Sequence, residues 1–282
     1  MRPGGSPSTL STVSLTGVCS GPQGRREACG VCHGEVGVCG LGLESYVGVV
    51  GLPSGVDLPE VSFLPTVGRV TKISVEVWSD LICPWCYIGK RRLAGALERF
   101  EWRDAVRVRW RSYELDPATP GGVDETIAQR MLRRQGIPPE RAAQLLAHVS
   151  RAAADEGLEY DLERARPVNT LDAHRLLHLA ADQGLADAVQ ERLMRAYTRE
   201  GALLSDHATL VRLAGEAGFA EDAARALLAS DDRTREVRED EARAAELGLS
   251  GVPSFVVDGR YAVSGAESAD SLLALLRRAV AA

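Results

Sequence analysis

Apolar and polar residues alternate in two short segments of the first half of the chain. In ISVEVWSD, residues 73–80, every second side chain is Ile or Val until the segment ends in Ser-Asp, and VRVRWRSYEL, residues 106–115, repeats the alternation. A period of two is the periodicity of a β-strand, whose successive side chains point to opposite faces. We therefore expect a first strand that stops at Ser79–Asp80 and a second strand over 106–115.

A helix is predicted between these strands. Pro84 suits the first helical position, because the N–H that proline lacks would have no partner within the helix there. Leu93, Ala96, Leu97 and Phe100 then recur at helical spacing and form one apolar face. A strand, a helix and a second strand in this order predict a unit whose two strands are parallel.

Helical periodicity dominates residues 117–231, and glycine closes most of the segments, as expected at helix C-termini. The expected helices are 124–136, 138–157, 169–184, 185–201, 207–218 and 220–230, followed by one more over 231–248. Residues 250–268 predict a hairpin with its turn at Asp258-Gly259, and a closing helix follows over Ala269–Ala281. These elements predict one sheet that is built from distant segments, with an all-helical insertion between them.

The composition changes near residue 70. The first 70 residues hold half of the 28 glycines and a single alanine, whereas the rest of the chain is rich in alanine and arginine. We expect residues 1–70 to be a disordered N-terminal extension, or an upstream region included by the choice of start codon. The folded part then divides into 71–116 with 232–282, which supply the sheet, and 117–231, the helical insertion.

Charge and hydropathy argue against two classes of partner. The net charge of -6 comes from 33 basic and 39 acidic residues without a basic block, so no nucleic acid is expected as a partner. No apolar run reaches the roughly 18 residues that cross a bilayer, and the N-terminus lacks the apolar core of a secretory signal. We therefore expect a cytoplasmic protein with no membrane partner.

Cys83 and Cys86 enclose Pro-Trp at the start of the predicted helix. A spacing of three residues places both thiols on one side of the helix, close enough to form a disulfide. The helix N-terminus stabilises the thiolate of Cys83 and makes it the nucleophile, whereas Cys86, one turn further in, is expected to be shielded and to act as the resolving thiol. The spacing alone also fits a zinc knuckle or coincidence.

A second cluster of potential metal ligands precedes this motif and comprises Cys19, Cys29, Cys32, His33 and Cys39. A four-ligand zinc site usually pairs two knuckles across a structured segment, whereas this cluster has one knuckle in a glycine-rich stretch. A site shared with Cys83 and Cys86 ranks lower still, because no clear scaffold joins the two pairs. We predict no metal site and no cofactor.

Five motifs occur in a fixed order: CPWCYIGKRR (83–92), ELDP (114–117), AHRL (173–176), AYTREG (196–201) and GVPSFVVDGRYAVSGA (251–266). In these motifs the chain resembles the FrnE-like branch of the DsbA family of thioredoxin-fold oxidoreductases. The resemblance implies an α/β protein with a thioredoxin-like fold and an inserted all-helical subdomain. It also implies that Pro253 has a cis peptide bond facing the cysteines, and that Val252 offers its backbone to an extended substrate.

The same resemblance implies that the helical insertion shapes a substrate groove. Asn169 and His174 are then candidates for substrate contacts, although Asn169 also fits a helix cap and His174 an ordinary helical histidine. Trp85 is expected to be exposed, where it either contacts substrate or acts as a spacer.

Three functions fit these features. The first is a thiol–disulfide oxidoreductase in which Cys83, Cys86 and Pro253 act on a disulfide- or dithiol-bearing protein or small molecule, through a mixed disulfide and with a thiol electron donor. The second is a glutathione-dependent small-molecule isomerase or transferase of the same fold, a class that typically has serine at the position of Cys83. The third is a non-enzymatic polypeptide-binding module. The oligomeric state is open, with a homodimer as one option.

Overall fold

The computed structural model describes residues 11–12, 72–119 and 125–281. The predicted disorder of residues 1–70 therefore lies outside the described residues, apart from Ser11–Thr12, as does the whole cysteine cluster of residues 19–39. The domain boundaries expected at residues 117 and 232 stay predictions.

The strands form one mixed sheet in the order β1-β5-β4-β2-β3. They are β1 Ser11–Thr12, β2 Ile73–Ser79, β3 Val106–Ser112, β4 Ser254–Val257 and β5 Tyr261–Ser264. β2 pairs with β3 in parallel, as predicted, and with β4 in antiparallel orientation, while β1 lies parallel to β5. β4 and β5 form the predicted hairpin, and its turn residues Asp258 and Gly259 have φ of 50° and 63°, which Asp and Gly tolerate.

β3 ends at Ser112, before the predicted end at Leu115. The N–H of Glu114 donates to Oε1 of Glu241 at 3.2 Å, and the N–H of Leu115 donates to Oδ2 of Asp80 at 2.7 Å. Because these two backbone N–H groups donate to carboxylates of other elements, they are not available to pair with a neighbouring strand, and the chain leaves the sheet here. The alternating pattern could not show these distant partners.

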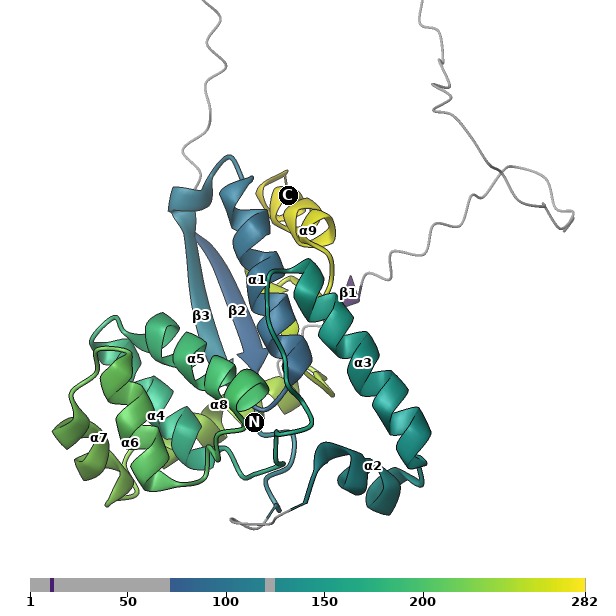
Figure 1. Cartoon of the computed structure of the whole chain (residues 1–282). Helices are drawn as coiled ribbons and strands as arrows, with labels where there is room; N and C mark the ends of the chain where they lie inside the picture. The colour runs from purple at the N-terminus through teal and green to yellow at the C-terminus, as the bar shows by residue number, and fades with distance from the viewer. Residues whose placement is uncertain (1–10, 13–71, 120–124, 282) are drawn as a thin grey trace, which may run out of the picture. The chain divides into compact units, whose positions relative to one another are not determined.

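Helices α1 Pro84–Glu98 and α9 Ala269–Ala281 pack side by side on one face of the sheet (Figure 1). Val75 and Val77 of β2 point into this layer and pack with Leu93 of α1, Phe255 of β4 and Leu272 of α9. The period-two pattern of β2 thus supplies one apolar core.

The opposite face of the sheet is covered by α8 Thr234–Glu246. Trp78 of β2 is fully buried there, packs with Ala244, and donates from its indole N–H to the carbonyl of Asp240 at 2.9 Å. Both faces of β2 are therefore buried, and the sheet lies between two helical layers.

The segment between β3 and β4 is helical, as predicted. It contains α2 Ile127–Gln135, α3 Pro139–Asp155, α4 Leu171–Asp182, α5 Ala186–Arg195 with the π-helical turn η2 Ala196–Glu200, α6 His207–Glu216, α7 Glu221–Leu228 and α8; a short 3₁₀ turn, η1 Arg103–Ala105, precedes β3. Glycines with positive φ follow α2, η2 and α8, at Gly136, Gly201 and Gly248. The sequence thus predicted both the insertion and most of its helix ends.

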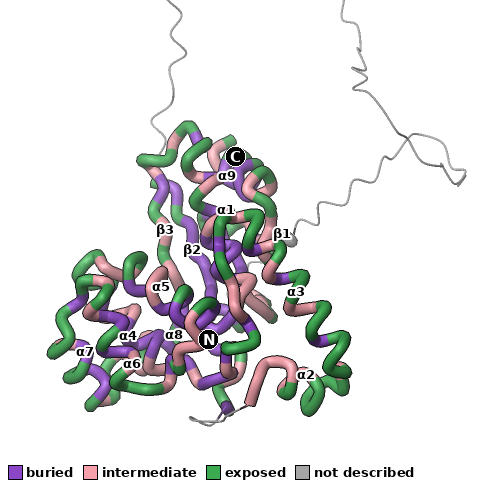
Figure 2. The backbone as a smooth tube through the Cα atoms, viewed as in Figure 1, coloured by how far each residue is buried: buried purple, intermediate pink, exposed green. Residues whose placement is uncertain are grey.

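A second apolar core lies among the insertion helices and includes both cysteines of the CPWC motif. Cys83, Cys86 and Ile88 belong to the same buried cluster as Leu193 of α5 and Tyr197 of η2. Figure 2 shows the buried tube running through β2 and into α1, whereas α2 has no buried residue. The insertion therefore covers the start of α1, where the cysteines lie.

Candidate active site

Cys83 is the last residue before α1. Its backbone is extended, with φ −88° and ψ 111°, and Pro84 occupies the first turn of the helix. The thiol bonds no amide of that turn; instead, its Sγ donates to the carbonyl oxygen of Val252 at 3.7 Å. The residue is 5% exposed and sits at the positive end of the α1 dipole.

Cys86 lies one turn deeper and is fully buried, as expected of a resolving thiol. Both cysteines are free, and Sγ of Cys86 accepts the N–H of Asp80 at 3.4 Å. Burial, and then the hydrogen bond and charge of Cys83, raise the pKa of Cys86 well above its usual value, while the Asp80 N–H and the Ser79 hydroxyl act in the opposite direction. Cys86 is thus held as a thiol with two donors ready to stabilise its thiolate.

Pro253 packs on Gly89 of α1, three residues after Cys86. The Val252–Pro253 bond is cis, as the resemblance implied. A β-carbon at Gly89 would lie 3.0 Å from Cγ of Pro253 and 3.3 Å from Cζ of Phe255, so this close approach favours a residue without a side chain. The contact between α1 and the segment before β4 brings the Val252 carbonyl opposite Cys83.

A buried carboxylate lies directly after β2. Asp80 is fully buried, accepts the N–H of Leu115 at 2.7 Å, and lies 3.4 Å from Nε2 of His174 on α4. The sequence marks Asp80 only as the carboxylate nearest the motif. Its pairing with His174 depends on a contact between β2 and the insertion that spacing does not predict.

His174 is 2% exposed, and its contact with substrate stays a prediction. Asn169 is half-buried, and its side-chain amide forms three hydrogen bonds. Its Nδ2 donates to Oε1 of Glu114 at 2.9 Å and to the carbonyl of Pro117 at 3.0 Å, and its Oδ1 accepts the N–H of Leu171 at 2.9 Å. Asn169 therefore joins the start of α4 to the loop after β3.

Trp85 is half-buried, so the prediction that it is exposed is wrong. Its ring lies 5.9 Å from the ring of His148 on α3, because α3 covers this side of α1. Tyr160 is a neighbour that the sequence did not indicate. Its hydroxyl donates to the carbonyl of Pro84 at 2.7 Å, and its ring stacks on Tyr87 at 6.2 Å.

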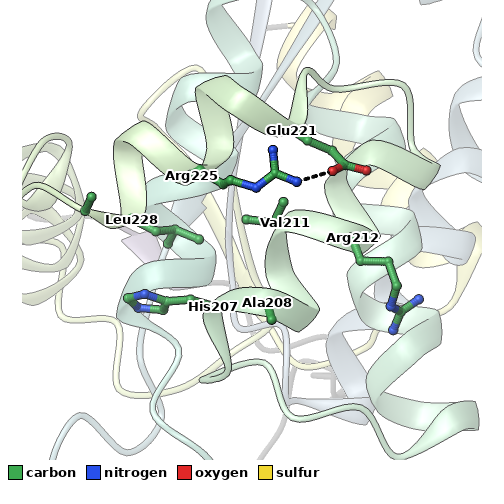
Figure 3. A pocket seen from close by; sticks show the side chains of 8 residues that line it. His207, Ala208, Val211, Arg212, Glu221, Arg225 and Leu228 are labelled. Atoms are coloured by element: carbon green, nitrogen blue, oxygen red, sulfur yellow. Dashed lines mark hydrogen bonds and ion pairs between the residues drawn. The ribbon is translucent and has the colours of Figure 1, made fainter.

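The cavities that the described residues line include the following three. One of about 610 Å³ runs beside β3 and is lined in part by Ser79, His174 and Gln190. A second of about 410 Å³ lies between α2, α3 and the loop that carries Tyr160. A third of about 480 Å³ lies between α6 and α7, where Arg225 is paired with Glu221 (Figure 3).

Two further findings concern residues 72–119 and 125–281. No helix in these ranges is both long and apolar enough to cross a bilayer. Within the same ranges, no three His, Cys, Asp or Glu side chains are grouped so that they could hold a metal ion.

Comparison with protein families decides the classification. The model of the DSBA-like thioredoxin domain matches residues 74–277, which is most of the chain. The chain belongs to this family. The DSBA-like domain thus includes the CPWC motif, the helical insertion and the hairpin with Pro253, and its fold is the thioredoxin-like fold with a helical insertion that the sequence predicted.

Individual relatives agree with this membership. A probable DsbA oxidoreductase from Streptomyces coelicolor is 39% identical, with a TM-score of 0.71 over 73% of this chain and 89% of that structure. The uncharacterized protein YwbO of Bacillus subtilis is 25% identical over 70% of this chain and 92% of its own length. A putative protein disulfide isomerase from Nitrosomonas europaea, at 20% identity and a TM-score of 0.56 over 73% of this chain and 97% of that structure, shares the fold.

Proposed function

We propose that this DSBA-like protein is a thiol–disulfide oxidoreductase of the FrnE-like branch. The observation that carries the proposal is the arrangement of its two thiols. Cys83 sits at the start of α1 opposite the Val252 carbonyl, and Cys86 is sealed one turn deeper. Both thiols are buried, but Cys83 is the less buried of the two, at 5% exposed against 0% for Cys86, so in an exchange through a mixed disulfide Cys83 is the thiol that a substrate disulfide reaches first.

The reaction has two steps that conserve electrons. The Cys83 thiolate attacks one sulfur of a substrate disulfide; a bond forms between Cys83 and that sulfur, and the other sulfur leaves as a thiolate. Cys86 then loses its proton and attacks Sγ of Cys83, which releases the remaining substrate thiolate and leaves a Cys83–Cys86 disulfide. The substrate disulfide is reduced by two electrons, and the cysteine pair is oxidised by two.

We propose that the protein reduces or isomerises disulfides in the cytoplasm. A small-molecule or protein thiol then acts as the electron donor that reduces the Cys83–Cys86 disulfide again. A reducing compartment keeps most protein thiols reduced, so an enzyme located there meets occasional disulfides to remove. The substrate binds along the segment before β4, with the Val252 backbone as an acceptor for an extended chain. Pro253, which packs on Gly89, positions that backbone.

Trapping of the mixed disulfide tests the proposal. A Cys86→Ala variant that is incubated with cell extract is expected to accumulate disulfide adducts through Cys83, and added dithiothreitol should release them. A Cys83→Ala variant, which keeps Cys86 and the four cysteines of residues 19–39, is the matched control and should form none of the adducts that depend on Cys83. Absence of adducts, together with absence of turnover of a protein disulfide by the unaltered protein, would show the proposal to be wrong.

The same variants distinguish the two other functions that fit the sequence. A glutathione-dependent isomerase or transferase would act on its small molecule without Cys86, because its chemistry needs no resolving thiol. A polypeptide-binding module would keep full activity when both cysteines are replaced by serine. An oxidoreductase loses its turnover in both cases.

A further inference from the structure

The cavity between α2 and α3, here called the α2–α3 pocket, shares a wall with the CPWC motif. Tyr160 forms that wall, and its hydroxyl donates to the carbonyl of Pro84, the residue after Cys83, at 2.7 Å. On the same side, the ring of His148 of α3 contacts the Trp85 ring. A chain bound at Cys83 therefore has the α2–α3 pocket as its neighbour on the insertion side.

The floor of the α2–α3 pocket is apolar. Its lining includes Ala128 of α2, Leu146 and Ala147 of α3, and Leu162 of the following loop, in a volume of about 410 Å³. None of the described lining residues is Lys or Arg. Figure 2 shows that α2 and much of the adjoining α3 are exposed or half-buried, and α2 buries no side chain. The pocket thus offers apolar surface that the fold of the described residues leaves uncovered.

The rim of the α2–α3 pocket is acidic. Asp161 is half-buried and Glu163 is exposed, and neither side chain forms an ion pair with any part of the chain that the structure describes. Nearby, Glu125 is paired with Arg130 and Arg133, and Glu156 and Glu159 of the loop after α3 are paired as well, whereas the two carboxylates of α3 itself form no ion pair with the described residues. Two unpaired carboxylates beside an apolar floor complement a positive charge next to an apolar side chain.

We propose that the α2–α3 pocket binds a large apolar side chain of a polypeptide substrate close to its disulfide, with an adjacent Lys or Arg against Asp161 and Glu163. This inference rests on the proposed function and names its substrate class, a basic and apolar polypeptide segment. Burial of one large apolar side chain favours binding by about tenfold or more. The pocket therefore adds selectivity to a reaction whose chemistry at Cys83 is the same for every disulfide.

The test uses the full-length protein and peptides with one cysteine in a mixed disulfide with a chromophoric thiol. Beside the cysteine, on either side, the peptides carry Leu-Lys, Leu-Glu, Ser-Lys or Ser-Glu. We expect kcat/KM to be about tenfold higher for Leu-Lys than for Ser-Glu. A small chromophoric disulfide without a peptide, measured in parallel, reports the exchange chemistry alone.

Two variants localise the effect. Ala147→Trp fills the pocket and should bring the Leu to Ser ratio close to one, whereas Ala154→Trp, at an exposed position of α3 outside the lining, should keep it. Glu163→Lys should reverse the preference from Lys to Glu in the peptide. All three should reduce the small disulfide at the unaltered rate.

Each contrary result has its own meaning. Equal kcat/KM for all peptides, or an unchanged ratio in Ala147→Trp, overturns the pocket proposal while turnover of the small disulfide leaves the proposed function standing. No turnover of either substrate class overturns both. If Ala147→Trp changes the molar mass in light scattering and not the peptide ratio, the pocket is an interface between copies, which also overturns the proposal.

Discussion

Replacement of Gly89 by alanine tests how tightly α1 packs on the segment before β4. A β-carbon at Gly89 would lie 3.0 Å from Cγ and 3.4 Å from Cβ of Pro253, whereas one at Gly95, on the same helix, would meet its nearest neighbour, Cβ of Ala269, at 3.8 Å. Alanine in place of glycine stabilises a helix interior by about 1 kcal/mol. Gly95→Ala should therefore stabilise the protein by that amount.

Gly89→Ala receives the same gain in helix propensity, but overpacking against a buried ring costs about 1–3 kcal/mol. We expect it to be neutral or destabilising by up to about 2 kcal/mol, and therefore less stable than Gly95→Ala by about 1–3 kcal/mol. The free energies of unfolding are measured in urea by circular dichroism. The displaced Pro253 should also slow disulfide exchange in Gly89→Ala only. Equal stabilisation by both substitutions would refute the close contact.

Three further outcomes follow from the contacts. Burial disfavours the ionised forms of Glu76 and Asp240, but hydrogen bonds outweigh it and lower the pKa of both carboxyls; the donors are Arg243 and Arg111 for Glu76, and His178, the Ser112 N–H and Arg111 for Asp240. Urea titrations should therefore show that this contribution to the free energy of unfolding is complete above about pH 4 and is lost as the pH falls further. A flat profile of stability against pH would contradict this. Because burial and Cys83 raise the pKa of Cys86, iodoacetamide at pH 8 should leave Cys86 unlabelled in the native protein and label it in urea, as mass spectrometry of the peptide that carries the CPWC motif will show. Asn169→Ala removes three hydrogen bonds and should destabilise the protein by about 2–3 kcal/mol without changing peptide kcat/KM, whereas a loss of kcat/KM would instead indicate substrate contact.

Local patterns were sufficient where the physical cause is local. The alternation over 73–80 predicted β2, Pro84 predicted the start of α1, and Asp258-Gly259 predicted the hairpin turn. Each depends on residues within one or two turns of chain. The end of β3 was predicted too late, because the amides of Glu114 and Leu115 bond carboxylates that are distant in sequence.

The candidate site divides in the same way. Its spacing, its helix start and the resemblance of its motifs were present in the sequence, and these predicted that Cys83, Cys86 and Pro253 form one site. The exposure of Trp85 was predicted wrongly, and Tyr160 was missed, because both depend on how α3 and the loop after it lie against α1.

The sequence by itself therefore determined the elements, their order and the identity of the two thiols, since propensity, capping and periodicity act between near neighbours. Tertiary structure alone decided how accessible each thiol is, which carboxylate lies behind the pair and where an uncovered apolar pocket remains. Those properties are set by burial and by contacts between residues far apart in the chain, such as Asp80 with His174 and Cys83 with Val252. Burial depends on how the whole chain packs, so a local sequence pattern does not predict it.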